Sequence, residues 1–376
     1  MATMFTGQYP DRTKTTRLDF TVGASPLLAR LLRDAGYDTY AFSANRILNR
    51  DNPRTAGFER FRFSAEKPAL HLIRFYQTDW NGPAFRGHAY GEPTYDDTYA
   101  LTRMLGDFRP PGRGRPYFLW AHYMDPHGPY APPPGYYEAR DAWLIAANRP
   151  WEGRYGKGYK RLYDGECRFM DDQLALVLPK FLADPNAVVI LTADHGEEFW
   201  EHGELTYGHG KSVYDTLVRI PLVVFVPRTP AARVNMPVSL VDLAPTVLAL
   251  AGVPAPKEMQ GKPFLTADGA PLTGDRDVYV GSAFFKVAAG KPERMDALVR
   301  WPYKLLIYHE RPDAPGEYYK LDEDDGERRP LADDEPGARA MRADLRAWAV
   351  ANGAGEEEAS YGGAAAPDLK ALGYIK

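Results

Sequence analysis

Short apolar runs alternate with helix-periodic segments through most of the chain. Apolar runs of about four to eight residues bounded by turn residues are typical of buried strands, and such runs predict strands at 37–42, 117–121, 187–192 and 221–226. Apolar residues spaced by three and four predict a helix over 27–35 that ends at Gly36, and helices near 159–182 and 241–251. Residues 2–7 are expected to be the end of a helix that Gly7 closes. This alternation predicts an α/β fold with a mostly parallel sheet and helices on both faces. The strands at 117–121, 187–192 and 221–226 are expected to share that sheet.

The pattern changes after about residue 270. Short strands separated by turns are predicted at 278–281, 297–299, 303–308 and 318–321, followed by a helix at 337–350. These strands predict a smaller antiparallel sheet. The domain organisation expected is a catalytic domain over 1–270, an antiparallel subdomain over 271–350, and a flexible Gly/Ala/Glu-rich tail over 351–376.

Composition and net charge limit the classes of binding partner that we expect for this chain. The chain has 376 residues and a formal net charge of −4, which gives no reason to expect binding to nucleic acid. No apolar run reaches the roughly 18 residues of a transmembrane helix, and we expect no signal peptide within residues 1–376. Cys167 is the single cysteine, so an intrachain disulfide is impossible. The compartment and the oligomeric state are left open by these numbers.

Asp194, His195 and Gly196 follow the predicted strand at 187–192 directly. A carboxylate and an imidazole held side by side at a strand end are suited to binding a metal ion, and the glycine allows the backbone to turn away. In open α/β sheets, ligands bind at this edge. Asp194 and His195 are therefore candidate metal ligands. The alternative for this tripeptide alone is a solvated turn after a strand.

Two further segments contain candidate substrate contacts. His127 lies in the loop Asp125–Tyr130, immediately after the strand at 117–121, and its alternative is an ordinary surface histidine. His209 and Lys211 lie in a glycine-flanked segment where either side chain could approach an anion closely. His202 is expected to be structural. Glu197 and Glu198 are expected to support the site indirectly or to be solvated.

Several segments, taken together and in order, resemble the sulfatase family of the alkaline phosphatase superfamily. They cover nearly the whole chain: Thr6-Gly7-Gln8-Tyr9-Pro10, Ala35-Gly36-Tyr37-Asp38-Thr39, Asp125-Pro126-His127-Gly128-Pro129-Tyr130, Asp194-His195-Gly196-Glu197, Val218-Arg219-Ile220-Pro221-Leu222, Leu240-Val241-Asp242-Leu243-Ala244-Pro245-Thr246 and Tyr303-Lys304-Leu305.

The resemblance implies an alkaline-phosphatase-like fold and hydrolysis of a small-molecule or glycan sulfate ester at a divalent cation. The cation is usually Ca²⁺, with Mn²⁺ or Zn²⁺ as alternatives. In the family, a Cys or Ser is converted to formylglycine, whose hydrate attacks sulfur. The resemblance assigns Asp194 and His195 to the metal and His127, with His209 or Lys211, to the substrate.

The chain also departs from the family pattern. The family motif Cys/Ser-x-Pro-Ser-Arg precedes the Thr-Gly pair, which places the formylglycine upstream of Met1 if Thr6-Gly7 is that pair. Cys167 cannot replace it, because no Pro-Ser-Arg follows. We therefore expect this chain to lack the N-terminal nucleophile segment and to be inactive alone. Residues 41–45 also lack the Lys and His that many sulfatases have there.

Two other functions stay open at this point. One is a phosphate or phosphonate ester hydrolase or transferase of the same superfamily, which would share this half of the site. The other is a non-catalytic remnant that binds sulfate.

Overall fold

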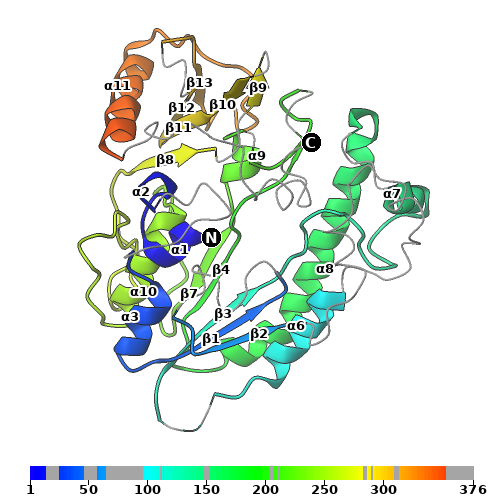
Figure 1. The fold of residues 1–376 in the computed structure, drawn as a ribbon, viewed down its shortest axis with the longest axis vertical. Coiled ribbons are helices and arrows are strands. Elements are labelled where there is room, and N and C mark those ends of the chain that lie inside the picture. The colour runs from blue at the N-terminus through cyan, green and yellow to red at the C-terminus, as the bar shows by residue number, and fades with distance from the viewer. Residues whose placement is uncertain are drawn as a thin grey trace. The chain divides into compact units, whose positions relative to one another are not determined.

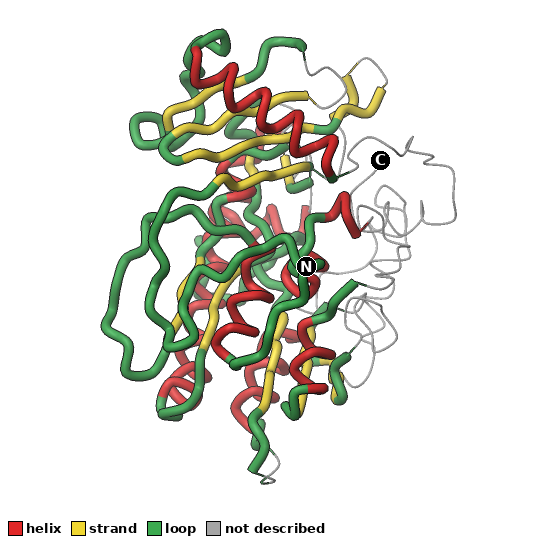
Figure 2. The backbone as a smooth tube through the Cα atoms, turned by 90° about the vertical axis from the view of Figure 1, so that its left-hand side faces the viewer, coloured by secondary structure: helices red, strands yellow, loops and turns green. Residues whose placement is uncertain are grey.

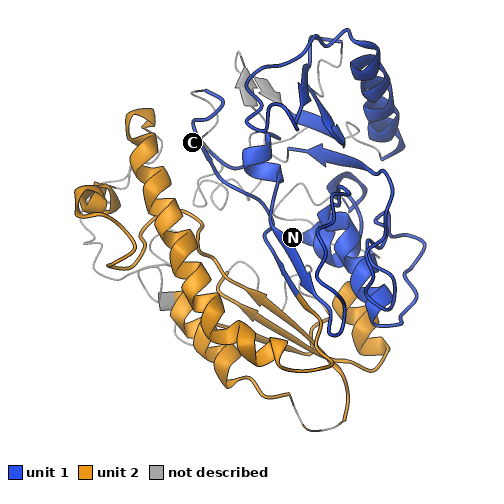
Figure 3. Ribbon diagram, turned by 180° about the vertical axis from the view of Figure 1, so that it is seen from behind, with its two compact units in different colours: residues 1–26, 190–361 blue, residues 27–189, 362–376 orange. Residues whose placement is uncertain are grey.

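The computed structural model describes residues 1–13, 25–45, 57–64, 96–110, 112, 114–147, 152–203, 207–210, 212–282, 286–288, 291–308 and 313–352. The chain divides into two compact units, coloured separately in Figure 3. Unit 1 comprises residues 1–26 and 190–361, and unit 2 comprises residues 27–189 and 362–376. Among the described residues, no helix is both long and apolar enough to cross a membrane.

A three-stranded parallel sheet organises unit 2 (Figure 1). Strand β1 (Asp38–Ser43) is central and pairs with β2 (Arg60–Phe63) on one side and with β3 (Tyr117–His122) on the other. All six residues of β1 are buried. This is the expected property of a central strand in a parallel sheet, whose two faces are both covered.

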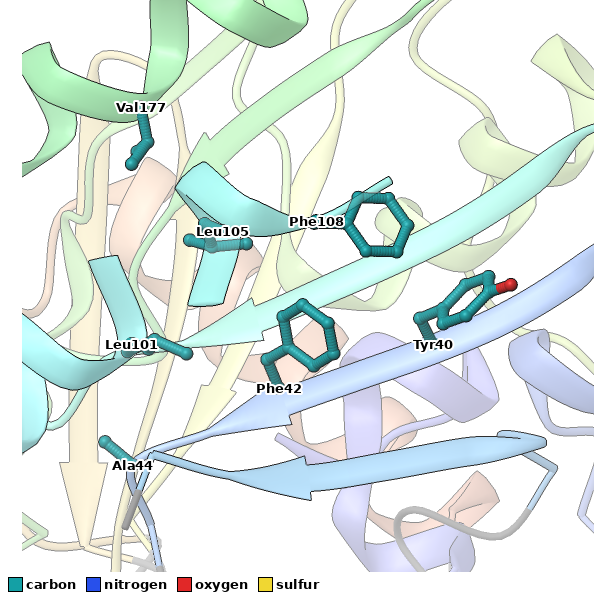
Figure 4. Close-up of a cluster of buried hydrophobic side chains, with 7 residues drawn as sticks. All are labelled: Tyr40, Phe42, Ala44, Leu101, Leu105, Phe108 and Val177. Carbon is teal, nitrogen blue, oxygen red and sulfur yellow. The ribbon is translucent and has the colours of Figure 1, made fainter. Parts of the chain in front are cut away.

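Two helices of unit 2, α6 (Asp96–Asp107) and α8 (Gly156–Leu182), contribute to the core beside this sheet. The other helices of unit 2 are α3 (Leu28–Asp34), α7 (Ala142–Ala147) and two short 3₁₀ helices, η2 (Ala139–Asp141) and η3 (Gly153–Tyr155). Figure 4 shows the cluster in which Tyr40 and Phe42 of β1 meet Leu101 and Leu105 of α6 and Val177 of α8. Successive residues of a strand point to opposite faces, so Tyr40 and Phe42, which are two residues apart, share the face that meets these two helices.

The N-terminal segment of unit 1 begins with α1 (Ala2–Thr6) and α2 (Pro10–Thr13). Gly7 ends α1 in the left-handed conformation, with φ of 62°, as the sequence predicts. The carbonyl oxygen of Gly7 accepts hydrogen bonds from the backbone N–H groups of Gln260 (2.7 Å) and Gly261 (3.1 Å). These bonds fix the Thr-Gly segment against a loop that is distant in sequence.

Further elements of unit 1 lead to the candidate site. They are β4 (Val189–Thr192, beginning at the unit boundary), β5 (Glu198–Phe199), β6 (Tyr207–Gly208), α9 (Asp215–Val218), β7 (Leu222–Phe225), η4 (Leu240–Asp242) and α10 (Leu243–Leu250). Strand β4 pairs with β7, and β5 pairs with β6. Ile190 of β4 and Leu222 of β7 pack with Leu243 of α10 in one apolar cluster.

The predicted antiparallel sheet is present in unit 1. Its strands are β8 (Asp277–Gly281), β11 (Met295–Arg300), β12 (Tyr303–Tyr308) and β13 (Glu317–Lys320), in the order β13-β12-β11-β8. A separate hairpin is formed by β9 (Lys286–Ala288) and β10 (Lys291–Glu293). Helix α11 (Pro336–Ala351) crosses the four strands in Figure 2.

Both faces of this antiparallel sheet are buried. Leu298 and Leu305 pack against Met341 and Leu345 of α11. Met295, on the opposite face of β11, packs in a cluster with Val213 and Tyr214 at the entry to α9. The sheet therefore supports, on its second face, the segment that follows His209.

One prediction about the parallel sheet is wrong in the described part of the chain. Strand β3 pairs with β1, whereas β4 pairs with β7, and no hydrogen bonding among the described residues joins the two pairs into one sheet. The sequence pattern identifies each strand but not its neighbours, because alternating strands and helices are compatible with several strand orders. The domain division at residue 270 stays a prediction.

Candidate active site

The candidate metal pair lies at the end of β4. Gly196 follows it, and its N–H donates to the carbonyl oxygen of Leu217 at 2.8 Å. A Cβ atom at position 196 would lie 2.1 Å from the carbonyl oxygen of Thr216. The glycine is thus required by the close approach of two backbone segments, which the sequence alone did not reveal.

The side chains of Asp194 and His195 are partly exposed, at 33% and 36% respectively. His195 Nδ1 lies 2.8 Å from the carbonyl oxygen of Gly196. A carbonyl oxygen only accepts hydrogen bonds, so Nδ1 carries the proton and Nε2 has the lone pair. Burial, followed by the proximity of His209, lowers the pKa of His195. The neutral imidazole, which is the form that binds metals, is therefore favoured.

The donor atoms of this pair fit a divalent cation. His195 Nε2 and Asp194 Oδ1 are 3.8 Å apart. Two atoms bound to one ion at about 2.3 Å, with an angle near 110° between them, are separated by about this distance. One imidazole nitrogen and one carboxylate oxygen are compatible with Ca²⁺, Mn²⁺ or Zn²⁺. Among the described residues, no group of three or more His, Cys, Asp or Glu side chains forms a metal cluster, so this pair alone is an incomplete ligand set.

His209 lies next to the candidate metal pair. Its ring stacks on that of His195 with 4.1 Å between centroids and 28° between planes. His209 Nδ1 lies 2.9 Å from Glu197 Oε1, and the side chains of His209 and Glu197 are 12% and 4% exposed. Because a carboxylate orients the imidazole and fixes which nitrogen is protonated, Glu197 determines how His209 is presented.

The loop that contains His127 is anchored within unit 2. Thr98 of α6 donates a hydrogen bond to Asp125 Oδ2 at 2.7 Å, and Glu166 of α8 accepts one from the backbone N–H of Ala131 at 2.6 Å. His127 Nδ1 donates to the carbonyl oxygen of Gly128 at 2.7 Å. Burial raises the pKa of Asp125 to about 6. The loop is therefore held on both sides of His127 by buried polar contacts.

The predicted site residues thus fall into three groups. Asp194, His195 and His209 lie together in unit 1. His127 belongs to unit 2. Lys211 lies outside the described residues. We expect Asp194 and His195 to share one polar cleft with His127 and with either His209 or Lys211, and this stays a prediction, as do their individual roles.

The side chains of Glu197, Glu198 and His202 are all buried, so the alternative that the two carboxylates are solvated is wrong. Glu197 is a partner of His209, and Glu198, which is fully buried, contacts His202. The signal in the sequence is that the two acids are consecutive and follow the candidate metal pair closely.

A family model covers more than half of the chain. The family model "Sulfatase" matches residues 1–253. The chain belongs to the sulfatase family. A second model, "N-sulphoglucosamine sulphohydrolase, C-terminal", matches residues 203–348, which include the antiparallel sheet. Membership of the family implies a divalent metal cofactor and places the chain in the alkaline phosphatase superfamily.

Curated relatives match part of the chain. The uncharacterized sulfatase YidJ of Escherichia coli (strain K12) is 29% identical over 199 residues, which are 46% of this chain and 40% of that protein. Arylsulfatase K of Danio rerio is 28% identical over 188 residues, which are 48% of this chain and 35% of that protein. The matched region thus spans well under half the length of these two relatives.

Solved structures confirm the fold class. The phosphonate monoester hydrolase SpPMH from Silicibacter pomeroyi aligns with a TM-score of 0.66 at 19% identity, covering 93% of this chain and 85% of that one. BT4656, solved with its substrate D-glucosamine-2-N,6-O-disulfate, aligns with a TM-score of 0.64 at 17% identity, covering 96% of this chain and 89% of that one. The predicted α/β, alkaline-phosphatase-like architecture with a smaller antiparallel sheet is therefore correct.

Proposed function

We propose that this chain provides the metal-binding and substrate-contacting part of a sulfate-ester hydrolase. The observation that carries the proposal is the cluster at the end of β4. There, His195 directs a lone pair toward the side of Asp194, and its ring stacks on a second histidine whose orientation is set by Glu197. Together with membership of the sulfatase family, this cluster supports an anion site beside a cation site.

Asp194 and His195 are the proposed metal ligands, with Ca²⁺ as the proposed ion and Mn²⁺ or Zn²⁺ as alternatives. When bound, a divalent cation offsets the negative charge on the sulfate oxygens. Asp194 contributes the negative charge that attracts the cation. His195 contributes a neutral nitrogen ligand, because its Nδ1 proton is held by the carbonyl oxygen of Gly196.

His209 is proposed to contact the sulfate group through Nε2. Its Nδ1 donates to Glu197, so only the doubly protonated ring can also donate a hydrogen bond to a sulfate oxygen. Glu197 stabilises that protonated form through its charge. Lys211, two residues later, is proposed to add a second positive charge to the same anion.

His127 is proposed as a substrate contact from the second unit. Its Nδ1 is occupied by the carbonyl oxygen of Gly128, which makes Nε2 the atom directed to a substrate. None of the printed residues is proposed as the nucleophile, because the sequence 1–376 contains no Cys/Ser-x-Pro-Ser-Arg motif. By analogy with the family, formylglycine is the proposed nucleophile. The proposed substrate is a small-molecule or glycan sulfate ester.

Cation binding tests the proposal without any need for activity. Calorimetric titration of the 376-residue chain with Ca²⁺, Mn²⁺ and Zn²⁺ should give binding that Asp194→Ala weakens by more than about tenfold, since even changes in the partners of metal ligands cost that much. Asp334→Asn, at an exposed carboxylate, is the matched control and should leave affinity unchanged. Equal cation affinity in Asp194→Ala and the unsubstituted chain would refute the ligand assignment.

Hydrolysis tests the reaction class. The protein is expressed with any in-frame coding sequence that precedes Met1 and with a formylglycine-generating enzyme, then assayed on 4-nitrophenyl sulfate, 4-nitrophenyl phosphate and a phenylphosphonate monoester. We expect turnover of the sulfate, abolished by Asp194→Ala. Turnover of the phosphonate or phosphate alone would replace the proposed function by that of the related esterases. Sulfate binding without any turnover would favour a non-catalytic protein.

A further inference from the structure

His202 is a buried histidine whose two ring nitrogens both face hydrogen-bond acceptors. It follows β5, and its side chain is 6% exposed. Nδ1 contacts Glu198 Oε1, and Nε2 lies 3.1 Å from the carbonyl oxygen of Gly326. A carboxylate and a carbonyl oxygen accept hydrogen bonds and do not donate them. With Glu198 ionised, both contacts are hydrogen bonds only if both nitrogens carry protons, which makes His202 an imidazolium cation.

The surroundings of the ring favour this charge. His202 stacks on Tyr214, with 3.8 Å between ring centroids and 8° between planes. The titratable groups that face it are Glu198 of β5, Glu327 of the loop after β13 and the Tyr214 phenol, with Lys304 beyond Glu327 at 2.7 Å. Burial opposes the charge, but the hydrogen bond and the charge of Glu198 outweigh it, and the pKa of His202 is raised.

Glu198 connects this cation to the candidate active site. Besides His202, it accepts a hydrogen bond from Ser212 Oγ at 3.0 Å. In the β5–β6 pairing, Glu198 lies opposite Gly208, the residue before His209. Glu197, the residue before Glu198, holds His209 at 2.9 Å. Glu197 and Glu198 are adjacent in the backbone, so one carboxylate is held by His202 while the preceding one orients His209.

We propose that His202 is a positioning residue: as a buried imidazolium, it ties Glu198 to Gly326 and thereby fixes the hairpin in which Glu197 orients His209. The inference deepens the proposed function, since it rests on His209 as a substrate contact. A neutral side chain at position 202 would leave Glu198 without its charged partner. The hairpin would then lose its connection to the loop at Gly326, and His209 would lose its defined place on His195.

The protonation state can be measured directly. In metal-free chain containing ¹⁵N-labelled histidine, NMR at pH 7.5 should show both nitrogens of His202 protonated, with the signal assigned by its loss in His202→Gln. This measurement requires no enzymatic activity. A single protonated nitrogen would place the shared proton on Glu198 and would overturn the proposal.

The positioning role is tested by the effect of His202→Gln on His209. The ¹⁵N signals of His209, assigned with His209→Gln, should shift, and kcat/KM for the aryl sulfate should fall by about tenfold or more. The cation affinity of His202→Gln should change by less than about threefold. A globally disrupted fold would instead lose both the cation affinity and the activity. Ser212→Ala, which keeps the Glu198–His202 pair, is the matched control and should have a much smaller effect.

Two outcomes separate the proposals. If the ¹⁵N signals behave as expected and the unsubstituted protein hydrolyses no sulfate ester, the proposed function fails and the placement of His209 by His202 stands. If His202→Gln leaves the His209 signals unchanged, the positioning role is refuted, whatever the activity.

Discussion

Asp125 should make the protein less stable at neutral pH than at mildly acidic pH. Burial raises its pKa from the ordinary 3.8 to about 6, despite the hydrogen bond from Thr98, and the neighbouring Asp97 adds to the rise. The folded state therefore holds the proton more tightly than the unfolded state does. Between pH 6 and 3.8, the unfolded chain binds fewer protons, so the free energy of unfolding rises as the pH falls.

The size of this effect follows from the two pKa values. A difference of about two pKa units, at roughly 1.4 kcal/mol for each, amounts to about 3 kcal/mol. Above pH 6, Asp125 is ionised in the folded state, and the full loss in unfolding free energy from the buried carboxylate is present. Below pH 3.8, Asp125 is protonated in both states, and this loss is absent. Asp125→Asn removes the titration and keeps an oxygen that can accept the hydrogen bond from Thr98.

Urea unfolding followed by tryptophan fluorescence from pH 4 to pH 8 measures the prediction. Relative to the unsubstituted protein, Asp125→Asn should gain about 3 kcal/mol in unfolding free energy on going from pH 4 to pH 7.5. Asp141→Asn is a control for which the stability difference should change with pH in the opposite direction. The hydrogen bonds from Arg161 lower the pKa of Asp141, so the ionised carboxylate stabilises the fold and the substitution should cost more as the pH rises. A stability difference for Asp125→Asn that is independent of pH, or that grows as the pH falls, would refute the reasoning.

Two further substitutions test the fold around the site. Lys304 is fully buried, and its Nζ lies 2.7 Å from a carboxylate oxygen of both Asp215 and Glu327. Lys304→Met leaves both carboxylates without their cation and should lower the free energy of unfolding by about 3–5 kcal/mol. Lys320→Met, at a more exposed ion pair, is the control and should cost about 1 kcal/mol or less. Gly196→Ala places a Cβ against the Thr216 carbonyl oxygen and should cost about 1–3 kcal/mol and weaken cation binding in the same titration. Equal urea midpoints for either variant and the unsubstituted protein would contradict the corresponding contact.

Elements with a strong local signal could be predicted from the sequence. The left-handed Gly7 after α1, the helix before Gly36, and the four antiparallel strands all appear where the pattern places them. Each depends on residues close together in the chain, such as a glycine at a helix end or apolar residues at one periodicity. These elements could therefore be predicted without knowledge of contacts between residues far apart in the sequence.

Strand order and the surroundings of charged groups could not be predicted in this way. The pairing of β3 with β1 and of β4 with β7 depends on tertiary packing, which the apolar runs do not encode. The need for Gly196 arises from a backbone segment about twenty residues later, at Thr216. The sequence predicts a structural role for His202 but does not identify its partner, because Gly326 lies more than a hundred residues away in the chain. Contacts of this range have no local sequence signal.

The consecutive acids Glu197 and Glu198 show how one short segment can connect stability to chemistry. Both carboxylates are buried, and each faces a histidine, but the two histidines have different surroundings. His202 lies between Glu198 and a backbone carbonyl oxygen, where both of its nitrogens are engaged. His209 stacks on a candidate metal ligand and has one nitrogen directed to Glu197. Glu197 and Glu198 are adjacent in the backbone, so the attachment of Glu198 to His202 limits the movement of Glu197. We therefore expect the placement of His209, the proposed substrate contact, to depend on the salt bridge between Glu198 and His202.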